Sequence, residues 1–186
     1  MAVAVQKLHF TGNDEADALL ASEPFALLVG FALDQQVSVQ SAFSGPLKLK
    51  QRLGTLDPGK IAATDPATLL EAFREKPAIH RFPGSMAERV QQLARLVEQE
   101  YDGDASRLWT GAADGADLRA RIAALPGFGE MKIKALGSVL AKRLGVEAAQ
   151  DLVPNHPTLG DVDSAQALEE YQAKKRAYKA KLRAEK

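Results

Sequence analysis

The sequence predicts an all-α fold for this chain of 186 residues. Three observations lead to this class. Apolar residues recur with the period of amphipathic helices along most of the chain. No segment alternates apolar and polar residues as a half-buried strand does, and proline, glycine or a short polar residue stands at nearly every expected helix boundary. We expect about ten helices, in one domain over residues 1–186 or in two small lobes that share a core.

The first two helices follow clear start signals. Asn13 or Asp14 can cap a helix through ADALLAS, because a short polar side chain accepts a hydrogen bond from the amides of the first turn. Pro24 opens the stretch PFALLVGFAL. This stretch is apolar almost all round, so we expect it at the centre of the core.

The next helices are separated by proline turns. One helix is expected from about residue 37 to 53, with Ser44-Gly45-Pro46 bending or breaking it, because proline removes a backbone donor. A single helical turn is expected at 60–63. Asp65, followed by a proline at the first helical position, caps a helix through 67–76.

The second half continues the pattern. Ser85 is the expected cap of the amphipathic helix MAERVQQLARLVEQEY, and Asp114 or Asp117 the expected cap of LRARIAAL. A further helix is expected at 132–144. The last helix is expected over about 164–186, after the least helical region of the chain.

Composition excludes several kinds of site. The chain has no cysteine, which excludes disulfides, thiol nucleophiles and cysteine-bound zinc or iron–sulfur clusters. Its three histidines lie far apart, so no metal site is expected. No run approaches the ~20 apolar residues that span a bilayer, and the N-terminus does not resemble a secretory signal. We expect a cytoplasmic monomer that needs no cofactor and no membrane.

Charge is balanced over the chain but unevenly distributed. The 24 basic and 24 acidic residues cancel, whereas a nucleic-acid binder usually has a basic excess. The final stretch, KKRAYKAKLRAEK, carries seven cations against Glu185. The sequence leaves open whether this basic end is a solvated helix, frays or contacts DNA.

The stretch LPGFGEMKIKAL interrupts two helical patterns with a proline and two glycines. Glycine permits positive φ and close backbone approach. The helix that follows begins with unpaired amides and the positive end of its dipole, so the amides of Gly127, Gly129 and Glu130 are expected to face one oxyanion. Lys132 and Lys134 would add phosphate contacts. The alternative is a plain turn between helices that needs glycines only to change direction. The order LPGFG favours the hairpin, because Leu125 and Phe128 can anchor it in its own core.

Two motifs together resemble a known family. Residues 124–129, ALPGFG, are similar to the helix-hairpin-helix of the HhH-GPD superfamily of base-excision DNA glycosylases. PFALLV followed by DQQVSVQSA resembles another segment of that superfamily, closest to its alkyladenine-removing branch. The resemblance covers most of the chain and is nearest to a short bacterial subgroup. It implies two helical lobes with a cleft, a possible monovalent cation at the hairpin carbonyls and double-stranded DNA as partner. Some relatives carry an iron–sulfur cluster, which the absence of cysteine excludes here.

The resemblance implies cleavage of the N-glycosidic bond of a damaged base flipped out of the duplex. Lysine-dependent members carry their nucleophile two residues after the last hairpin glycine, where this chain has Met131. Lys132 is one place further round the helix and is expected to point elsewhere. We therefore expect a monofunctional enzyme without lyase activity, with Lys132 as an alternative nucleophile.

A carboxylate is needed near the sugar to stabilise positive charge in the transition state. The superfamily aspartate is expected about 20 residues beyond the last glycine, and no close match stands there. Asp161 is the expected catalytic residue, with Asp163 and Asp151 as alternatives. Asp163 has another role available, because Asp163 and Gln166 form a capping-box pattern.

Other candidates for contact with DNA are spread along the chain. The resemblance implies that Gln35 and Gln36 probe base edges or fill the gap left by the flipped base; the alternative is a polar kink between helices. The candidate base-pocket residues are Phe31, Phe82 and Trp109, and the alternative for each is packing in the core. His80 and Arg81, on a loop, are candidates for contact with phosphate or with the base pocket, and the alternative is a position on the surface. Phe128, Lys142 and Arg143 complete the expected DNA-binding set. A non-catalytic DNA-binding protein and a protein–protein adaptor remain the alternative functions.

Overall fold

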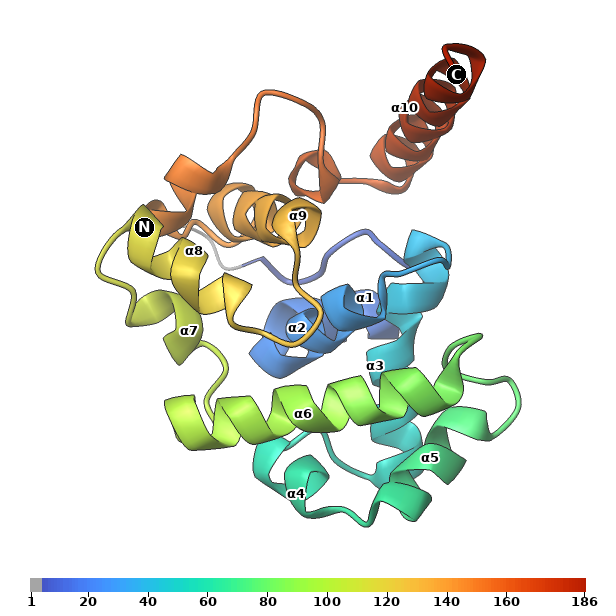
Figure 1. Ribbon diagram of the computed structural model, residues 1–186, viewed down its shortest axis with the longest axis vertical. Coiled ribbons are helices and arrows are strands. Elements are labelled where there is room, and N and C mark those ends of the chain that lie inside the picture. Colours follow the sequence, from blue (N-terminus) through green and yellow to red (C-terminus); the bar gives the residue numbers. More distant parts are fainter. Residues whose placement is uncertain (1–4) are drawn as a thin grey trace.

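The computed structural model describes residues 5–186, and this part of the chain is entirely helical (Figure 1). It contains ten α-helices and two short 3-10 helices and no strand, which confirms the predicted all-α class. The helices are α1 (Asp14–Ser22), α2 (Pro24–Leu33), α3 (Val39–Leu53), α4 (Pro58–Ala63), α5 (Pro66–Arg74), α6 (Pro83–Tyr101), α7 (Arg107–Thr110), α8 (Gly115–Ala123), α9 (Glu130–Lys142), η1 (Glu147–Leu152), η2 (Leu159–Asp161) and α10 (Ala165–Ala184).

The helices pack in two groups that follow the chain. Helices α1 to α6 pack mainly on one another, and α2 lies among them with nine of its ten residues buried. Helices α7 to α9 pack with η1 and η2 in a second group (Figure 1). The apolar residues buried in both groups form one continuous core. The expected central position of the apolar helix α2 is confirmed.

Three predicted caps form the expected hydrogen bonds. The side chains of Asn13, Asp65 and Asp114 accept from backbone amides in the first turns of α1, α5 and α8. The cap of α1 is well formed, with 2.9 Å between Asn13 Oδ1 and Ala16 N. Local polar chemistry therefore defines where these helices begin.

Ser44-Gly45-Pro46 was expected to bend or break the helix, and the structure shows that it does not break α3. The helix is continuous from Val39 to Leu53 with Pro46 inside it. Gly45 permits close packing, because a Cβ there would collide with the side chain of Leu33 in α2. Burial of this face against α2 outweighs the hydrogen bond that proline removes.

Two capping predictions were wrong. Helix α6 begins at Pro83, so Ser85 lies inside the helix and does not cap it. At α10 the cap is Ser164, whose hydroxyl accepts from Ala167 N at 3.0 Å. Asp163 therefore does not form the capping box expected at α10. A capping box is present at η2 instead, between Thr158 and Asp161.

Within residues 5–186, no single helix is long and apolar enough to cross a membrane. Helices α1 and α2 reach that length and composition only as a pair, and their axes are bent by 114° at the junction.

Candidate functional site

The hairpin between α8 and α9 is anchored by its apolar residues. Leu125 and Phe128 are almost fully buried, and Phe128 N donates to Leu125 O at 3.2 Å. Gly127 between them has φ of 77°, a conformation that favours glycine. The two side chains therefore hold the turn rigidly in the core, as the sequence suggested.

The outer edge of the hairpin leaves backbone donors unpaired. Gly127, Gly129 and Glu130 are exposed, and their amides make no hydrogen bond within the described part of the chain. Gly129 caps α9 without a side-chain hydrogen bond, and a Cβ there would meet open space. Unpaired amides at the positive end of a helix dipole form a site for an oxyanion such as a phosphate.

The side chain of Glu130 is turned into a salt bridge beside this edge. It pairs with Arg119 and lies 3.8 Å from the amine of Lys134. The hydrogen bond from Arg119 lowers the pKa of Glu130, so the carboxyl group is ionised and neutralised by its partners. The amine of Lys134 therefore lies beside a carboxylate at the edge of the hairpin.

A family model for the HhH-GPD superfamily of base excision DNA repair proteins matches residues 29–184, which is most of the chain. The chain belongs to this superfamily. No curated protein and no solved structure matches it. Superfamily membership implies DNA binding, and HhH-GPD proteins are typically DNA glycosylases.

In this HhH-GPD protein, Lys132 is turned toward α2, in a direction different from that of Met131 at the expected nucleophile position. Met131 is 80% exposed, whereas Lys132 is partly buried. The amine of Lys132 lies 3.4 Å from Ala32 O at the end of α2 and 5.7 Å from the centre of the Phe128 ring. The lysine stands one residue later than in lysine-dependent members, and at this position it faces α2. The next residue, Ile133, is part of the core.

The surroundings of Lys132 change its basicity. Burial, and after it the nearby Arg89 guanidinium, together lower its pKa from 10.5 to about 8, against an opposing effect of Asp34. A lysine with a pKa near physiological pH has a substantial neutral fraction, which is the form that acts as a nucleophile.

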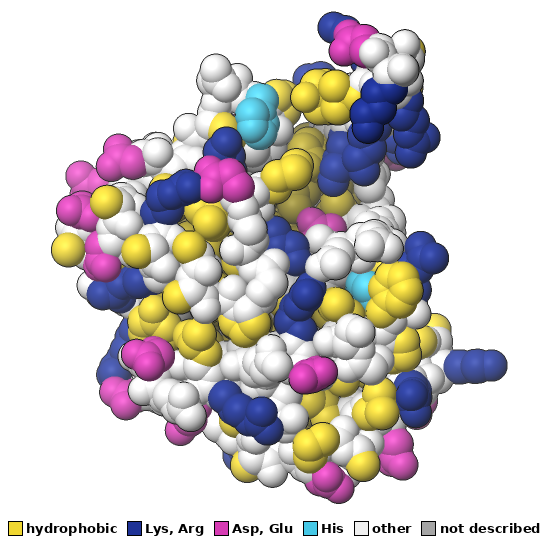
Figure 2. Space-filling view, viewed as in Figure 1, with side chains coloured by type: hydrophobic (Ala, Val, Ile, Leu, Met, Phe, Trp, Pro, Cys, Tyr) yellow, Lys and Arg dark blue, Asp and Glu magenta, His cyan; other side chains and the backbone are white. Residues whose placement is uncertain are grey.

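Asp34 is a carboxylate at this site that the sequence analysis did not select. Burial raises its pKa, and the charges of Lys175, Lys132 and Lys179 oppose the increase. Asp34 also raises the pKa of the partly buried Tyr171 hydroxyl, after the larger effect of burial. Acidic and basic groups with mutually perturbed pKa values are characteristic of active sites. Figure 2 shows the surface hollowed beneath α10, with charged side chains of both signs in the hollow.

Arg89 of α6 joins the two motifs that carried the resemblance. Its guanidinium packs on the hairpin, so that a Cβ on Gly127 would lie 2.7 Å from Arg89 Cζ. The same group donates to Gln35 Oε1 at 2.6 Å. We call Asp34, Gln35, Arg89, Lys132 and Tyr171 the central cluster. Arg89 had no distinguishing sequence signal, because it lies on the polar face of an amphipathic helix.

The turn after α2 is held by His80, which was expected on the surface. His80 is 2% exposed, and its Nε2 lies 3.1 Å from the carbonyl oxygens of both Leu33 and Gln35. Phe82 N donates to its Nδ1, so Nε2 carries the proton and donates to those carbonyls. Burial lowers the pKa of His80, which keeps the ring neutral. His80 therefore positions the turn and does not face a ligand.

Gln36 lies at the tip of this turn in a strained conformation. Its φ is 58°, in the left-handed region that residues other than glycine rarely adopt. Its side chain is exposed and makes no hydrogen bond within residues 5–186, whereas its carbonyl lies 3.5 Å from Arg81 Nη1. Strain of this kind concentrates at functional sites. Of the two glutamines, Gln36 has the freer side chain, because Gln35 Oε1 accepts from Arg89.

Asp161 lies away from the central cluster. Burial would raise its pKa, but hydrogen bonds from Lys142 and the Thr158 amide lower it, and the Lys142 amine is 2.5 Å from Asp161 Oδ1. Lys142 follows Lys132 by ten residues on α9, which corresponds to about 15 Å along the helix. Both carboxylate oxygens of Asp161 therefore have structural partners at the far end of α9.

Of the two alternative aspartates, Asp151 lies in η1 and Asp163 follows η2. Asp163 is exposed, with no hydrogen bond from its side chain in the described residues. Asp151 packs against the start of α8, where a Cβ on Gly115 would lie 2.6 Å from its carboxylate. Neither is brought to the hairpin.

Two aromatic predictions are corrected. Phe31 is fully buried in edge contact with Phe43, and Trp109 of α7 is 7% exposed in the core. Neither side chain opens onto a site for a flipped base. Phe82 is 42% exposed, with Arg81 5.0 Å from the centre of its ring, so it remains available for stacking.

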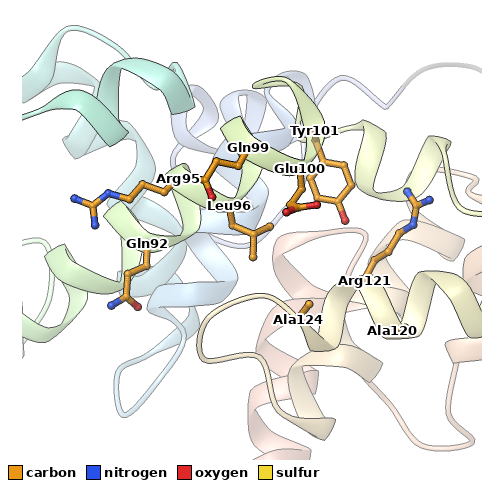
Figure 3. A pocket seen from close by; sticks show the side chains of 9 residues that line it. All are labelled: Gln92, Arg95, Leu96, Gln99, Glu100, Tyr101, Ala120, Arg121 and Ala124. Carbon is orange, nitrogen blue, oxygen red and sulfur yellow. The ribbon is translucent and has the colours of Figure 1, made fainter.

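A groove also lies elsewhere, between α6 and α8 (Figure 3). It has a volume of about 580 Å³ and includes Arg95, Tyr101 and Arg121 among its lining residues. None of the predicted site residues lines it. It is an open surface groove, and the candidate site is the central cluster with the hairpin.

Proposed function

We propose that this HhH-GPD protein is a DNA glycosylase that removes a damaged base, with alkylated bases as the first class to test, after the base leaves the duplex. The observation that carries the proposal is the position of the unpaired hairpin amides beside the central cluster. The amides would hold the DNA backbone, while Asp34 and Lys132 would face the sugar. Gln36 would occupy the space left by the base.

In this proposal Asp34 supplies the carboxylate that the sequence analysis assigned to Asp161. An ionised Asp34 would stabilise the positive charge that develops on the sugar as the glycosidic bond breaks, or orient the attacking water. Two observations support it: the Lys132 amine lies 3.4 Å from Ala32 O, two residues before Asp34, and its charge opposes the increase in the pKa of Asp34, whereas Asp161 pairs with Lys142 further along α9.

The test compares these carboxylates in single-turnover base release. Duplexes carry alkylated adenine, uracil, hypoxanthine or oxidised guanine, and the variants are Asp34→Asn, Asp161→Asn and Asp163→Asn. We expect Asp34→Asn to slow release by about 10²-fold or more, a loss typical of removing an electrostatic stabiliser. A loss confined to Asp161→Asn would return the catalytic role to that residue. DNA binding without release of any base would identify a non-catalytic DNA-binding protein.

Lysine chemistry is a second candidate, favoured by the inward position and lowered pKa of Lys132. The neutral amine would attack C1′ as the base departs with the bonding electrons and takes up a proton. Opening of the sugar ring would leave an imine on Nζ, and β-elimination would break the C3′–O bond.

Borohydride reduction separates this reaction from water-mediated hydrolysis. Covalent trapping of wild type but not of Lys132→Gln would establish the imine, and trapping should accelerate toward pH 8 as the amine loses its proton. Base release without trapping at any pH would leave the monofunctional enzyme, as the sequence analysis expected.

A further inference from the structure

The C-terminal helix α10 holds the positive excess of the whole molecule. Residues 174–186 contain seven of the 24 basic residues beside a single acid, which leaves 17 basic and 23 acidic residues on the rest of the chain. A protein that binds a polyanion with a net-negative body needs a local source of positive charge. On this chain the main local source is α10.

One face of α10 places its cations next to the central cluster. Leu168 is buried and Tyr171 partly buried, and the same face continues through Lys175 to Lys179 and Arg183. These three cations are spaced four residues apart, about 6 Å along the helix. Lys175 Nζ lies 5.8 Å from the centre of the ring of Tyr171, a member of the cluster, and the charges of Lys175 and Lys179 both oppose the increase in the pKa of Asp34.

The cations of α10 are available for a partner. Within residues 5–186, none of the seven forms a salt bridge with a carboxylate. Figure 1 shows α10 projecting from the body after its first turns, and Figure 2 shows its cations beside the hollow. Two side-chain hydrogen bonds between Gln40 and Gln172, of 3.0 and 2.7 Å, hold the base of the helix against α3.

We propose that α10 is a second clamp on the DNA backbone, in which Lys175, Lys179 and Arg183 bind phosphates of the same duplex that the hairpin amides hold. The clamp rests on the proposed function, because its ligand is the DNA that carries the target base. Two separated contacts fix the direction of the duplex across the central cluster. A membrane is a poorer partner, since a membrane-binding helix needs a continuous apolar face, and Tyr178 and Leu182 are the only large apolar side chains exposed on α10.

The test measures affinity for a short lesion-free duplex as a function of salt concentration. The clamp variant combines Lys175→Gln, Lys179→Gln and Arg183→Gln. The matched control combines Lys60→Gln, Arg74→Gln and Lys76→Gln, which remove the same charge from exposed positions on and after α4 and α5. Circular dichroism verifies that both variants remain helical.

We expect the clamp variant to bind at least about tenfold more weakly at low salt and to lose about three units of slope in log Kd against log salt. The control should keep the wild-type slope. A variant that exchanges the cations, with Lys175→Arg, Lys179→Arg and Arg183→Lys, should also keep the wild-type slope, because the phosphate contacts need positive charge and not a particular side chain.

Equal slopes for the clamp variant and the control, with wild type binding normally, would overturn the clamp and leave the proposed function intact. If the wild-type protein did not bind DNA, both the clamp and the proposed function would be wrong. Binding to phosphatidylserine vesicles tests a membrane surface as the alternative partner. The proposal would be overturned in favour of a membrane if the clamp variant, but not the control, lost vesicle binding while its salt dependence of DNA binding stayed unchanged.

Discussion

At the scale of single residues, burial determines the protonation of the central cluster. Lys132 and Asp34 are both partly buried and influence each other's pKa, without forming a salt bridge within the described residues. Burial disfavours the charged form of each, and the opposite charge opposes that effect. Such a pair is costly for folding and useful for catalysis, since its charges are poorly satisfied until a substrate is bound.

Lys132 should therefore destabilise the protein at neutral pH. Its pKa falls from 10.5 to about 8 on folding, so the unfolded chain binds more protons between these values and stability rises with pH across that window. Lys132→Met should raise the free energy of unfolding by about 1 kcal/mol near neutral pH, after allowance for solvent screening.

Urea unfolding of both proteins near pH 7 and about two units higher checks this expectation. The gain should shrink at the higher pH, where Lys132 is largely neutral in the folded wild type. A gain that does not change with pH would mean that packing, and not charge, stabilises the variant.

At the scale of elements, the two glycines of the hairpin have different roles. Gly127 combines φ of 77° with close contact to Arg89, whereas Gly129 has φ of −89° and open space at its Cβ position. One glycine serves the fold, and the other leaves room for a ligand.

Substitution by alanine should separate these roles. Gly127→Ala should destabilise the protein by about 1–2 kcal/mol, because alanine is strained at positive φ and Arg89 must move. Gly129→Ala should leave the unfolding midpoint nearly unchanged but weaken DNA binding, because its methyl group stands beside the unpaired amides. Equal loss of stability in the two variants would contradict this division.

A third glycine controls the packing of η2 on α9. A Cβ on Gly160 would lie 2.6 Å from the backbone carbonyl of Ser138, and backbone cannot rotate away as a side chain can. Gly160→Ala should cost about 2 kcal/mol or more. Thermal unfolding measures the cost, with the exposed Gly84→Ala, for which no atom lies within 4 Å, as the control.

At the scale of the whole molecule, α10 is held to the two helix groups by few contacts. It packs on η2, and its mutual amide pair with Gln40 reaches α3. Segments with little buried apolar surface open locally at low free energy. The helix that carries the positive charge is therefore the most independent part of the structure.

Gln40→Ala should increase this independence without affecting the core. Proteolysis within residues 174–186 should become several-fold faster, while the global free energy of unfolding should change by less than about 1 kcal/mol. Limited trypsin digestion monitored by mass spectrometry, beside urea unfolding, gives both quantities. An unchanged cleavage rate would show that other contacts hold α10.

The sequence by itself determined the helical class, most helix starts and the hairpin, because these depend on neighbours within a few positions. Asn13, Asp65 and Asp114 cap as expected, and Leu125 and Phe128 fill the core as expected. Only the tertiary structure decided which charges meet. Arg89 joins Gly127 to Gln35, and Lys132 reaches Ala32 O from a hundred residues away, through packing that no local pattern encodes. The same packing engages Asp161 with Lys142 and leaves Asp34 in the central cluster.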